Sequence, residues 1–511
     1  MQQRPACWPA VLLAGAAALF HHKALFSASY SIPWDFRYFH QPLAALMTRA
    51  FASGAFPLWD TSTYCGRPLY AVIQAQAFYP PAILTALAGA VLGEGRLLSL
   101  MEIHLTAHVA LAGVFTYALL RALGLGRAAA LTGALIYELG AFFASQAQHM
   151  GAVDAAAWMP LAWWGVVMLG RRFSWRRMAA LTVALAMSFL AGFTAMTIVV
   201  FASTGALALL LAAARLAPAS LLLYAAGACA WALLLSAVQL LPTLELTGLS
   251  AASGRAAFGD GGGLPAAALA SLVWPNRWGV LDYDPETWTL PWNPTWLYLY
   301  CGMAAPVLAA AALARRFGRE TVVFAALTAG FGIWMFGGGT PVGRAIYGLL
   351  PRPVQNALYV EFAMAAFVLA LAVLAAMGAE ALLAGRGPCL RAAAVALVAA
   401  ELIWTGSGHP FHLSDDPGTS PEQVDGLAAI PPFLREATGR SYPPSRIDNM
   451  GGSPTWTGCS PVFRVPSANG DDPFALTRML RVRGIFGRGA PWERYYRSEE
   501  HTSELQSLSH L

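Results

Sequence analysis

Charged side chains are scarce in this sequence. Only 12% of its 511 residues are charged, whereas a soluble globular protein carries about 25%. Hydrophobic residues make up 57% of the chain, and its mean hydropathy is +0.53. This composition excludes an ordinary soluble domain and predicts an all-α polytopic membrane protein.

Lysine is nearly absent as well. Lys23 is the only lysine, and every other basic residue is an arginine. The arginines gather in short loops between apolar segments, which is a signal of membrane topology and not of nucleic-acid binding. We therefore expect membrane lipids, and no nucleic acid, among the partners of the chain.

The six cysteines lack the spacing of a metal or redox site. No CxxC pair occurs, and no HExxH motif surrounds the histidines. Most of the cysteines are expected to be small apolar fillers, with a disulfide between Cys65 and Cys459 as the alternative if both face an oxidising compartment. The sequence identifies no metal ligand set. The cofactor stays unknown at this point, with a divalent metal as the open candidate.

Long apolar runs, by contrast, recur along the chain. A run of about 20 residues is long enough to cross a hydrocarbon core of about 30 Å as a helix. The first run is longer than a signal-peptide core and lacks a clear cleavage site, so it is interpreted as a retained span. Eleven spans are predicted, at 8–28, 97–120, 128–146, 153–170, 178–192, 194–214, 219–241, 295–314, 321–337, 356–384 and 391–407.

The arginines orient these spans. They flank or fill the short loops 121–127 and 171–177, so the positive-inside rule makes these loops and the amino terminus cytoplasmic. The apolar segment 78–93 is short and contains two adjacent prolines, so we predict an interfacial or re-entrant helix there. Gly192 is predicted to divide 178–214 into two crossings, because arginines flank both ends of that stretch.

The long loops then lie outside, above all the first one, 29–96. We expect residues 1–407 to form the transmembrane domain. Residues 408–496 are rich in Pro, Gly, Ser and Asp, with extended stretches such as PVFRVPS (461–467), and predict an extracytoplasmic, β-containing soluble domain that packs over the first loop. Residues 497–511 resemble translated sequencing-adaptor sequence, so they are left out of the fold, and the native chain is expected to continue further.

The first loop carries the strongest candidate for catalysis. Asp35 follows the first span within a few residues, and its neighbours Trp34, Phe36 and Tyr38 are typical of an aromatic belt at a membrane surface. A carboxylate held in such a partly desolvated setting is a common general base. The alternative is that Asp35 only caps the helix predicted over 35–52.

Other polar residues of this loop are predicted to bind substrate. Asp60 could contact a ligand, or it could pair with Arg67 or cap a turn. Gln74 and Gln76 alternate in a polar, aromatic stretch and could hydrogen-bond a sugar or a phosphate, or instead satisfy backbone groups in an irregular loop.

Further candidates lie in the remaining outer segments. His149 and Glu245 are polar groups beside the same predicted surface. Arg255 and Arg352 could each hold a lipid phosphate through two hydrogen bonds, with a snorkelling side chain at the membrane interface as the alternative.

Two histidines fall inside a predicted span. His104 and His108 share one helical face, at a spacing that can bind a metal. Without an HExxH motif, an interior hydrogen-bonded pair is the simpler interpretation.

Three phrases of the sequence together resemble a known family. FPLWDTSTYCGRPLYAVIQAQAFYPP (56–81), QLLPTLEL (239–246) and FGGGTPVGRAIYGLLP (336–351) are similar to signatures of the YfhO-like bacterial membrane proteins. The likeness runs over about residues 30–410. That family is placed with the GT-C class of glycosyltransferases.

The resemblance implies a GT-C-like fold, a polyprenyl-phosphate sugar donor and a glycan or lipid acceptor in the cell envelope. It implies transfer on the outer side of the bacterial cytoplasmic membrane, with Asp35 as a base or metal partner. The chain departs from the family at Cys65, where a glycine pair is usual, and at VQNALYVEF (354–362), where arginines are usual.

We therefore expect a membrane glycosyltransferase-like enzyme. One alternative is a transporter or flippase of lipid-linked intermediates, a class that favours ionisable groups near the midplane and internal repeats. No clear repeat is seen in this sequence. The other alternative is a non-catalytic envelope scaffold whose outer domain binds a partner.

Overall fold

The computed structural model describes residues 7–27, 29–254, 262–278, 294–408, 430–440, 444–448, 458–470 and 472–486. The helices, in chain order, are α1 (Trp8–Phe20), α2 (His22–Phe26), α3 (Gln41–Ala52), α4 (Pro80–Leu92), α5 (Leu97–Ala122), α6 (Arg127–Leu139), α7 (Ala141–Ser145), α8 (Met150–Ala157), α9 (Met159–Arg171), α10 (Trp175–Leu190), α11 (Thr194–Ala213), α12 (Ser220–Leu235), α13 (Ala237–Leu249), α14 (Ala304–Arg315), α15 (Arg319–Met335), α16 (Pro341–Leu349), α17 (Arg352–Ala357), α18 (Ala363–Leu383), α19 (Pro388–Gly406), α20 (Ile430–Gly439), α22 (Ser460–Phe463) and α23 (Thr477–Phe486).

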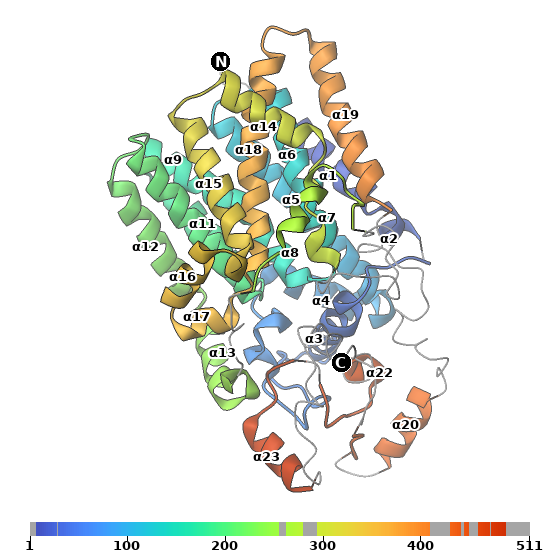
Figure 1. The fold of residues 1–511 in the computed structure, drawn as a ribbon. Coiled ribbons are helices and arrows are strands. Elements are labelled where there is room, and N and C mark those ends of the chain that lie inside the picture. Colours follow the sequence, from blue (N-terminus) through green and yellow to red (C-terminus); the bar gives the residue numbers. More distant parts are fainter. Residues whose placement is uncertain are drawn as a thin grey trace.

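The long helices run side by side as a bundle, and shorter helices gather at one end of it (Figure 1). We call this end, which carries α3, α4 and α22, the loop end. The connections from α11 to α12, from α14 to α15 and from α18 to α19 lie at the opposite end. These are arginine-bearing loops, so their common position agrees with the predicted topology. Which end faces the cytoplasm stays a prediction.

The number of spans is smaller than predicted. Six helical stretches in the described residues are long and apolar enough to cross a membrane, or seven if α12 and α13, which meet at a bend of 71°, count as one. The other four predicted spans correspond to shorter helices, since α1, α10, α14 and α15 have 13, 16, 12 and 17 residues. The run predicted at 295–314, for example, is helical only from Ala304, and the first run is broken at His21 between α1 and α2.

Other predicted boundaries are confirmed. Gly192 separates α10 from α11, and α4 is a short apolar helix of 13 residues.

The helix at the centre of the bundle is α18. Its most apolar stretch is completely buried, whereas only 22% of the most apolar stretch of α19 is buried. Gly378 explains how tightly α18 packs, since a Cβ there would collide with the carbonyl oxygen of Leu308 on α14.

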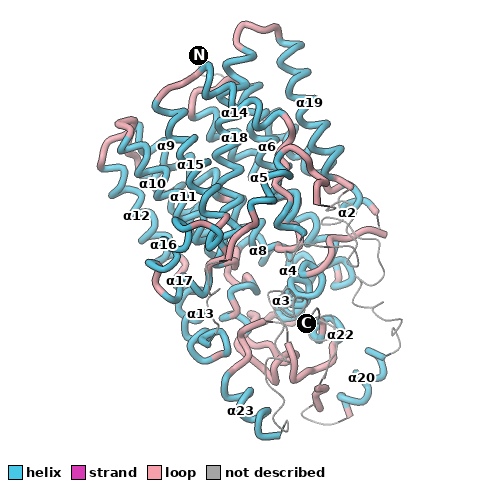
Figure 2. Tube along the Cα trace, in the orientation of Figure 1, coloured by secondary structure: helices cyan, strands magenta, loops and turns pink. Residues whose placement is uncertain are grey.

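The C-terminal segment does not contain the expected strands. Its described residues form α20, α22 and α23, and Figure 2 draws only helices and loops there. The stretch 461–467 was predicted to be extended, but its first residues belong to α22. The helix ends at Phe463, and the chain turns there because Arg464 adopts a left-handed φ of 56°. Isolated β-bridges such as that between Ile447 and Ser467 are the nearest approach to a sheet among the described residues.

The predicted packing of this segment over the first loop is confirmed for the described residues. The Tyr64 hydroxyl donates to the backbone carbonyl of Asp472 over 2.6 Å, and Arg49 donates to the carbonyl of Pro461 over 2.6 Å. The alternative of a disulfide is wrong, since neither Cys65 nor Cys459 takes part in one.

Candidate active site

Asp35 lies where the first loop meets the bundle. It directly precedes a five-residue π-helix, Phe36–His40, which leads into α3. Its side chain makes no capping hydrogen bond to that helix, so the capping alternative is wrong. Trp34, immediately before it, has a left-handed φ of 55°, a strained conformation for a bulky residue that is often found at functional sites.

His149 faces Asp35 from the start of α8. The His149 Nε2 atom lies 3.9 Å from a carboxylate oxygen of Asp35, and the Asp35 side chain is 25% exposed. Gln146 fixes the ring: its amide nitrogen donates to the Thr295 carbonyl, so its oxygen faces His149 Nδ1 at 2.8 Å and must accept from it. With Nδ1 donating to Gln146, Nε2 is the ring nitrogen that faces the Asp35 carboxylate, and a hydroxyl placed between them would contact both groups.

Aromatic rings enclose His149 on its other sides. Trp296 stacks on the imidazole with centroids 5.9 Å apart, and Phe193 and Phe362 lie 6.2 Å and 6.0 Å away. These rings restrain the imidazole and form an apolar wall around the polar pair. A few convergent polar groups against an apolar wall are the usual make-up of a ligand site.

His40 connects this pair to the interior. It is buried at the end of the π-helix, and its electrostatic neighbours are His149 and Asp154. Burial, helped by His149 and opposed by Asp154, lowers the pKa of His40 from 6.5 to about 3. The residue is therefore neutral at physiological pH.

A small pocket, partly open to solvent, lies between α3 and α4, and its free space of about 20 Å³ has room for a water molecule. Both predicted glutamines line it, as do His40, Thr85 and Met150. The structure therefore brings Gln74 and Gln76 to one pocket, and their contacts with a sugar or a phosphate stay predictions.

Glycine at position 192 allows Gln76 to reach its partners. Gly192 has a φ of +86°, and a Cβ there would collide with the carbonyl oxygen of Ile73 in the first loop. Because the backbones come this close, Gln76 donates to the Ala191 carbonyl over 2.6 Å and to an Asp154 carboxylate oxygen over 2.8 Å.

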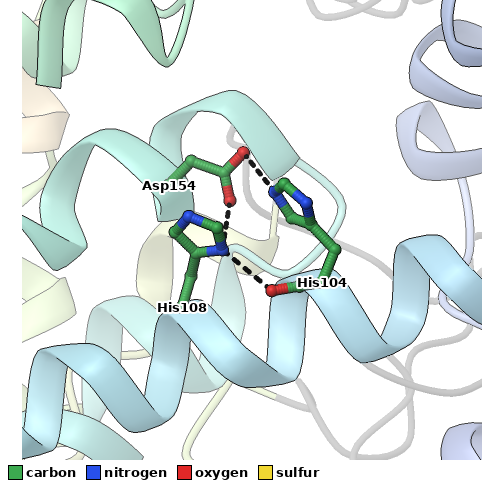
Figure 3. Close-up of side chains that lie close together, drawn as sticks. All are labelled: His104, His108 and Asp154. Atoms are coloured by element: carbon green, nitrogen blue, oxygen red, sulfur yellow. Dashed lines mark hydrogen bonds and ion pairs between the residues drawn. The ribbon is translucent and has the colours of Figure 1, made fainter. Parts of the chain in front are cut away.

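The two histidines of α5 meet the same aspartate. Asp154 projects from α8 between His104 and His108, as Figure 3 shows. Asp154 was not among the residues singled out from the sequence, although it is fully buried. Sequence reasoning also missed His40 and Thr85, for which the sequence offers no distinguishing signal.

Asp60 and Arg67 pair as the sequence suggested, with Arg67 Nε 3.3 Å from Asp60 Oδ2. Asp472 joins them, and all three side chains are almost completely buried. Their polar atoms serve this ion cluster, so we do not include them in the proposed site.

Glu245 is not brought to the pocket, and the structure does not describe the side chains of the two remaining predicted arginines. Glu245 is exposed on α13. Arg352 is the first residue of α17, and Arg255 lies outside the described residues. Their proposed contacts with a lipid phosphate stay predictions.

Comparison with solved structures relates the fold to two kinds of membrane protein. The apo form of the oligosaccharyltransferase from Archaeoglobus fulgidus matches with a TM-score of 0.50 and 12% identity, over 93% of this chain and 65% of that one. The oligosaccharyltransferase AglB from the same organism, in complex with an inhibitory peptide and a dolichol-phosphate, matches with a TM-score of 0.52 and 13% identity, over 92% and 64%. Both coverages mean that this chain spans about two thirds of the oligosaccharyltransferase.

A third match covers nearly all of both chains. ArnT from Cupriavidus metallidurans, bound to undecaprenyl phosphate, gives a TM-score of 0.51 and 12% identity, over 98% of this chain and 91% of that one. No protein-family model and no curated protein sequence matches the chain. At these identities the likeness establishes a shared fold.

Proposed function

We propose that this chain is a membrane glycosyltransferase of the GT-C class that takes a sugar from a polyprenyl-phosphate donor. The observation that carries the proposal is the fold shared with two proteins whose structures contain a polyprenyl phosphate, dolichol-phosphate in AglB and undecaprenyl phosphate in ArnT. The narrower assignment to the YfhO-like proteins rests on the three sequence phrases alone.

Asp35 is the proposed base. Its carboxylate takes the proton of an acceptor hydroxyl as that oxygen forms a bond to the anomeric carbon of the sugar. The bond from the anomeric carbon to the phosphate oxygen breaks, and the polyprenyl phosphate leaves with the electron pair. Attack opposite to the leaving group inverts the configuration at the sugar carbon.

His149 positions the acceptor in this scheme. Its Nε2 lone pair, held toward Asp35 by the Gln146 hydrogen bond, can accept from the hydroxyl before the proton moves to Asp35. The aromatic wall formed by Phe193, Trp296 and Phe362 excludes water from one side of the pair. Removal of water strengthens the electrostatic effect of the carboxylate.

Asp35 and His149 do not form a complete metal site by themselves. In the part of the chain that the structure describes, no third histidine, cysteine or carboxylate lies close enough to make a three-ligand group with them. Two donors are fewer than the usual three protein ligands of a catalytic zinc site, so no step is assigned to a metal here.

The proposed setting is the bacterial cytoplasmic membrane, with the amino terminus in the cytoplasm and the loop end outside. The acceptor is then a glycan or lipid of the cell envelope. Arg255 and Arg352 are the proposed ligands of the departing phosphate. Guanidinium groups suit that role because they bind phosphate through two parallel hydrogen bonds.

A flippase or transporter of lipid-linked intermediates is the second candidate. Ionisable residues buried within the bundle favour it, namely His104, His108 and Asp154, because transporters carry such groups near the midplane. A non-catalytic scaffold is the third candidate. It would leave the Asp35–His149 pair and the neighbouring pocket without a role.

Reconstitution separates these functions. The purified chain is placed in liposomes with a sugar-labelled polyprenyl phosphate and an envelope extract as acceptor. An enzyme moves label from the lipid to the acceptor and releases unlabelled polyprenyl phosphate. A flippase exposes the labelled lipid on the opposite leaflet with the sugar still attached, and that outcome would refute the transferase proposal.

A further inference from the structure

The cluster of His104, His108 and Asp154 has the donor set of a transition-metal site. The three side chains come from two helices, α5 and α8, and each offers one ligand atom within 4.8 Å of the others (Figure 3). All three side chains are at least 95% buried. None of them belongs to the Asp35–His149 pair, so the cluster is separate from the proposed transferase site.

Both histidines lie close to the Asp154 carboxylate. His104 Nε2 lies 3.0 Å from Asp154 Oδ2, and His108 Nδ1 lies 3.4 Å from Asp154 Oδ1. Zinc bonds to nitrogen and oxygen are about 2.0–2.1 Å long, so tetrahedral ligands are about 3.3 Å apart. The three ligand atoms lie within 4.8 Å of one another, so they would adjust their positions around an ion.

One carboxylate oxygen is left without a hydrogen bond. Asp154 Oδ2 accepts from Gln76 and lies 3.0 Å from His104 Nε2, but Oδ1 has no hydrogen-bond partner although it is buried. His108 Nδ1, which is near enough to contact it, donates to the backbone carbonyl of His104 over 2.8 Å. A buried carboxylate oxygen without a donor is costly, and a bound cation would satisfy it.

Both imidazoles have a partner for the second nitrogen. Thr85 Oγ1 lies 2.8 Å from His104 Nδ1, and the Tyr79 hydroxyl lies 2.6 Å from His108 Nε2. Trp158 in turn donates to the Tyr79 hydroxyl over 2.9 Å. Such outer partners orient histidine ligands and fix the nitrogen that carries the proton.

Two side chains link the pocket to the cluster. Gln76 and Thr85 line the pocket, and each is hydrogen-bonded to a member of the cluster, Gln76 to Asp154 and Thr85 to His104. The cluster therefore lies one side chain away from the pocket.

We infer that His104, His108 and Asp154 bind one divalent transition-metal ion of the zinc type beside this pocket. Two imidazole nitrogens and a carboxylate suit Zn²⁺ or Co²⁺, whereas Mg²⁺ and Ca²⁺ prefer oxygen ligands. His104 would bind through Nε2. His108 would bind through Nδ1 after that nitrogen gives up its proton and its hydrogen bond to the His104 carbonyl, and the ring proton would then lie on Nε2 toward Tyr79. Water would complete the coordination.

Metal binding to the full chain in detergent, with no sugar donor present, tests the inference. The protein is stripped with a chelator, and Zn²⁺ or Co²⁺ is added. We expect one ion per chain, a visible absorption band of tetrahedral Co²⁺, and a melting temperature that rises with Zn²⁺. His104→Gln and His108→Gln should abolish all three signals. Tyr79→Phe, which keeps every ligand, should weaken affinity about 10–100-fold.

Two histidine controls locate the ion. His22→Gln removes an exposed histidine outside the cluster, and His149→Gln removes the histidine of the proposed transferase site. Both should retain one Zn²⁺ per chain. Absence of stoichiometric metal in the wild-type chain would overturn the inference, as would loss of the ion in His149→Gln or its retention in His104→Gln. None of these outcomes depends on glycosyl transfer.

Discussion

Arg67 and Asp472 form a buried ion pair although 405 residues separate them in the sequence. Burial alone lowers the pKa of the Arg67 guanidinium, but Asp472 and Asp60 outweigh it, so its pKa is raised and the group stays charged. The pair joins the first loop to the C-terminal segment. It therefore holds that segment over the loop that carries the candidate site.

Asp472→Asn should release this contact. The substitution leaves a buried guanidinium with only Asp60 as counter-ion, and breaking a buried pair costs about 3–5 kcal/mol. We expect faster proteolysis between α19 and α22 and a lower melting temperature. Glu436→Gln, which breaks an exposed pair with Arg440 on α20, is the control and should change neither. Equal protease resistance of Asp472→Asn and wild type would show that the pair does not hold the segment.

The topology predicts opposite labelling of two native thiols. Cys65 in the first loop and Cys389 at the start of α19 are both exposed, and they belong to opposite ends of the predicted topology. A membrane-impermeant maleimide applied to intact cells should modify a chain that keeps Cys65 alone. A chain that keeps Cys389 alone should react only after the membrane is opened. The reverse pattern would place Asp35 in the cytoplasm and remove the basis for transfer on the outer side.

His40 should make the fold sensitive to acid. Its pKa is about 3 in the folded chain, against an ordinary value of 6.5, so the unfolded chain binds the proton more readily. The free energy of unfolding is therefore highest above pH 6.5. Proton uptake by the unfolded chain lowers it as the pH falls from 6.5 toward 3, by about 2 kcal/mol at pH 5. Melting of the wild type and of His40→Gln between pH 7.5 and 5 measures the difference. The wild type should lose more stability over this range, and parallel curves would contradict the effect.

Local features of the fold could be predicted from the sequence. The break at Gly192 and the short helix after Tyr79 follow from glycine, proline and hydropathy. The pairing of Asp60 with Arg67 could be predicted because the two residues are only seven positions apart in the sequence. Asp35 was singled out by its position after the first span, and its lack of a capping hydrogen bond now removes the competing explanation.

Contacts between distant segments could not be predicted. Nothing in the sequence indicates that Asp154 meets His104, 50 residues earlier, or that Asp472 meets Arg67. Such contacts depend on how helices pack, which a hydropathy pattern does not specify. The same limit explains the overcounted spans, since a buried, non-helical stretch such as Tyr298–Cys301 has the composition of a span.

The most direct test of the account compares Asp35→Asn with the wild type in sugar transfer from a polyprenyl-phosphate donor. The amide keeps the size of the side chain but cannot take a proton, and a general base contributes about 10²–10⁴-fold to the rate. Because the amide keeps the size of the carboxylate and can still accept a hydrogen bond, the variant should insert and melt like the wild type. Glu436→Gln, the same chemical change at an exposed site, should keep full activity. We predict that Asp35→Asn loses transfer at least 100-fold with unchanged stability, and near-wild-type transfer by this variant would contradict the catalytic role of Asp35.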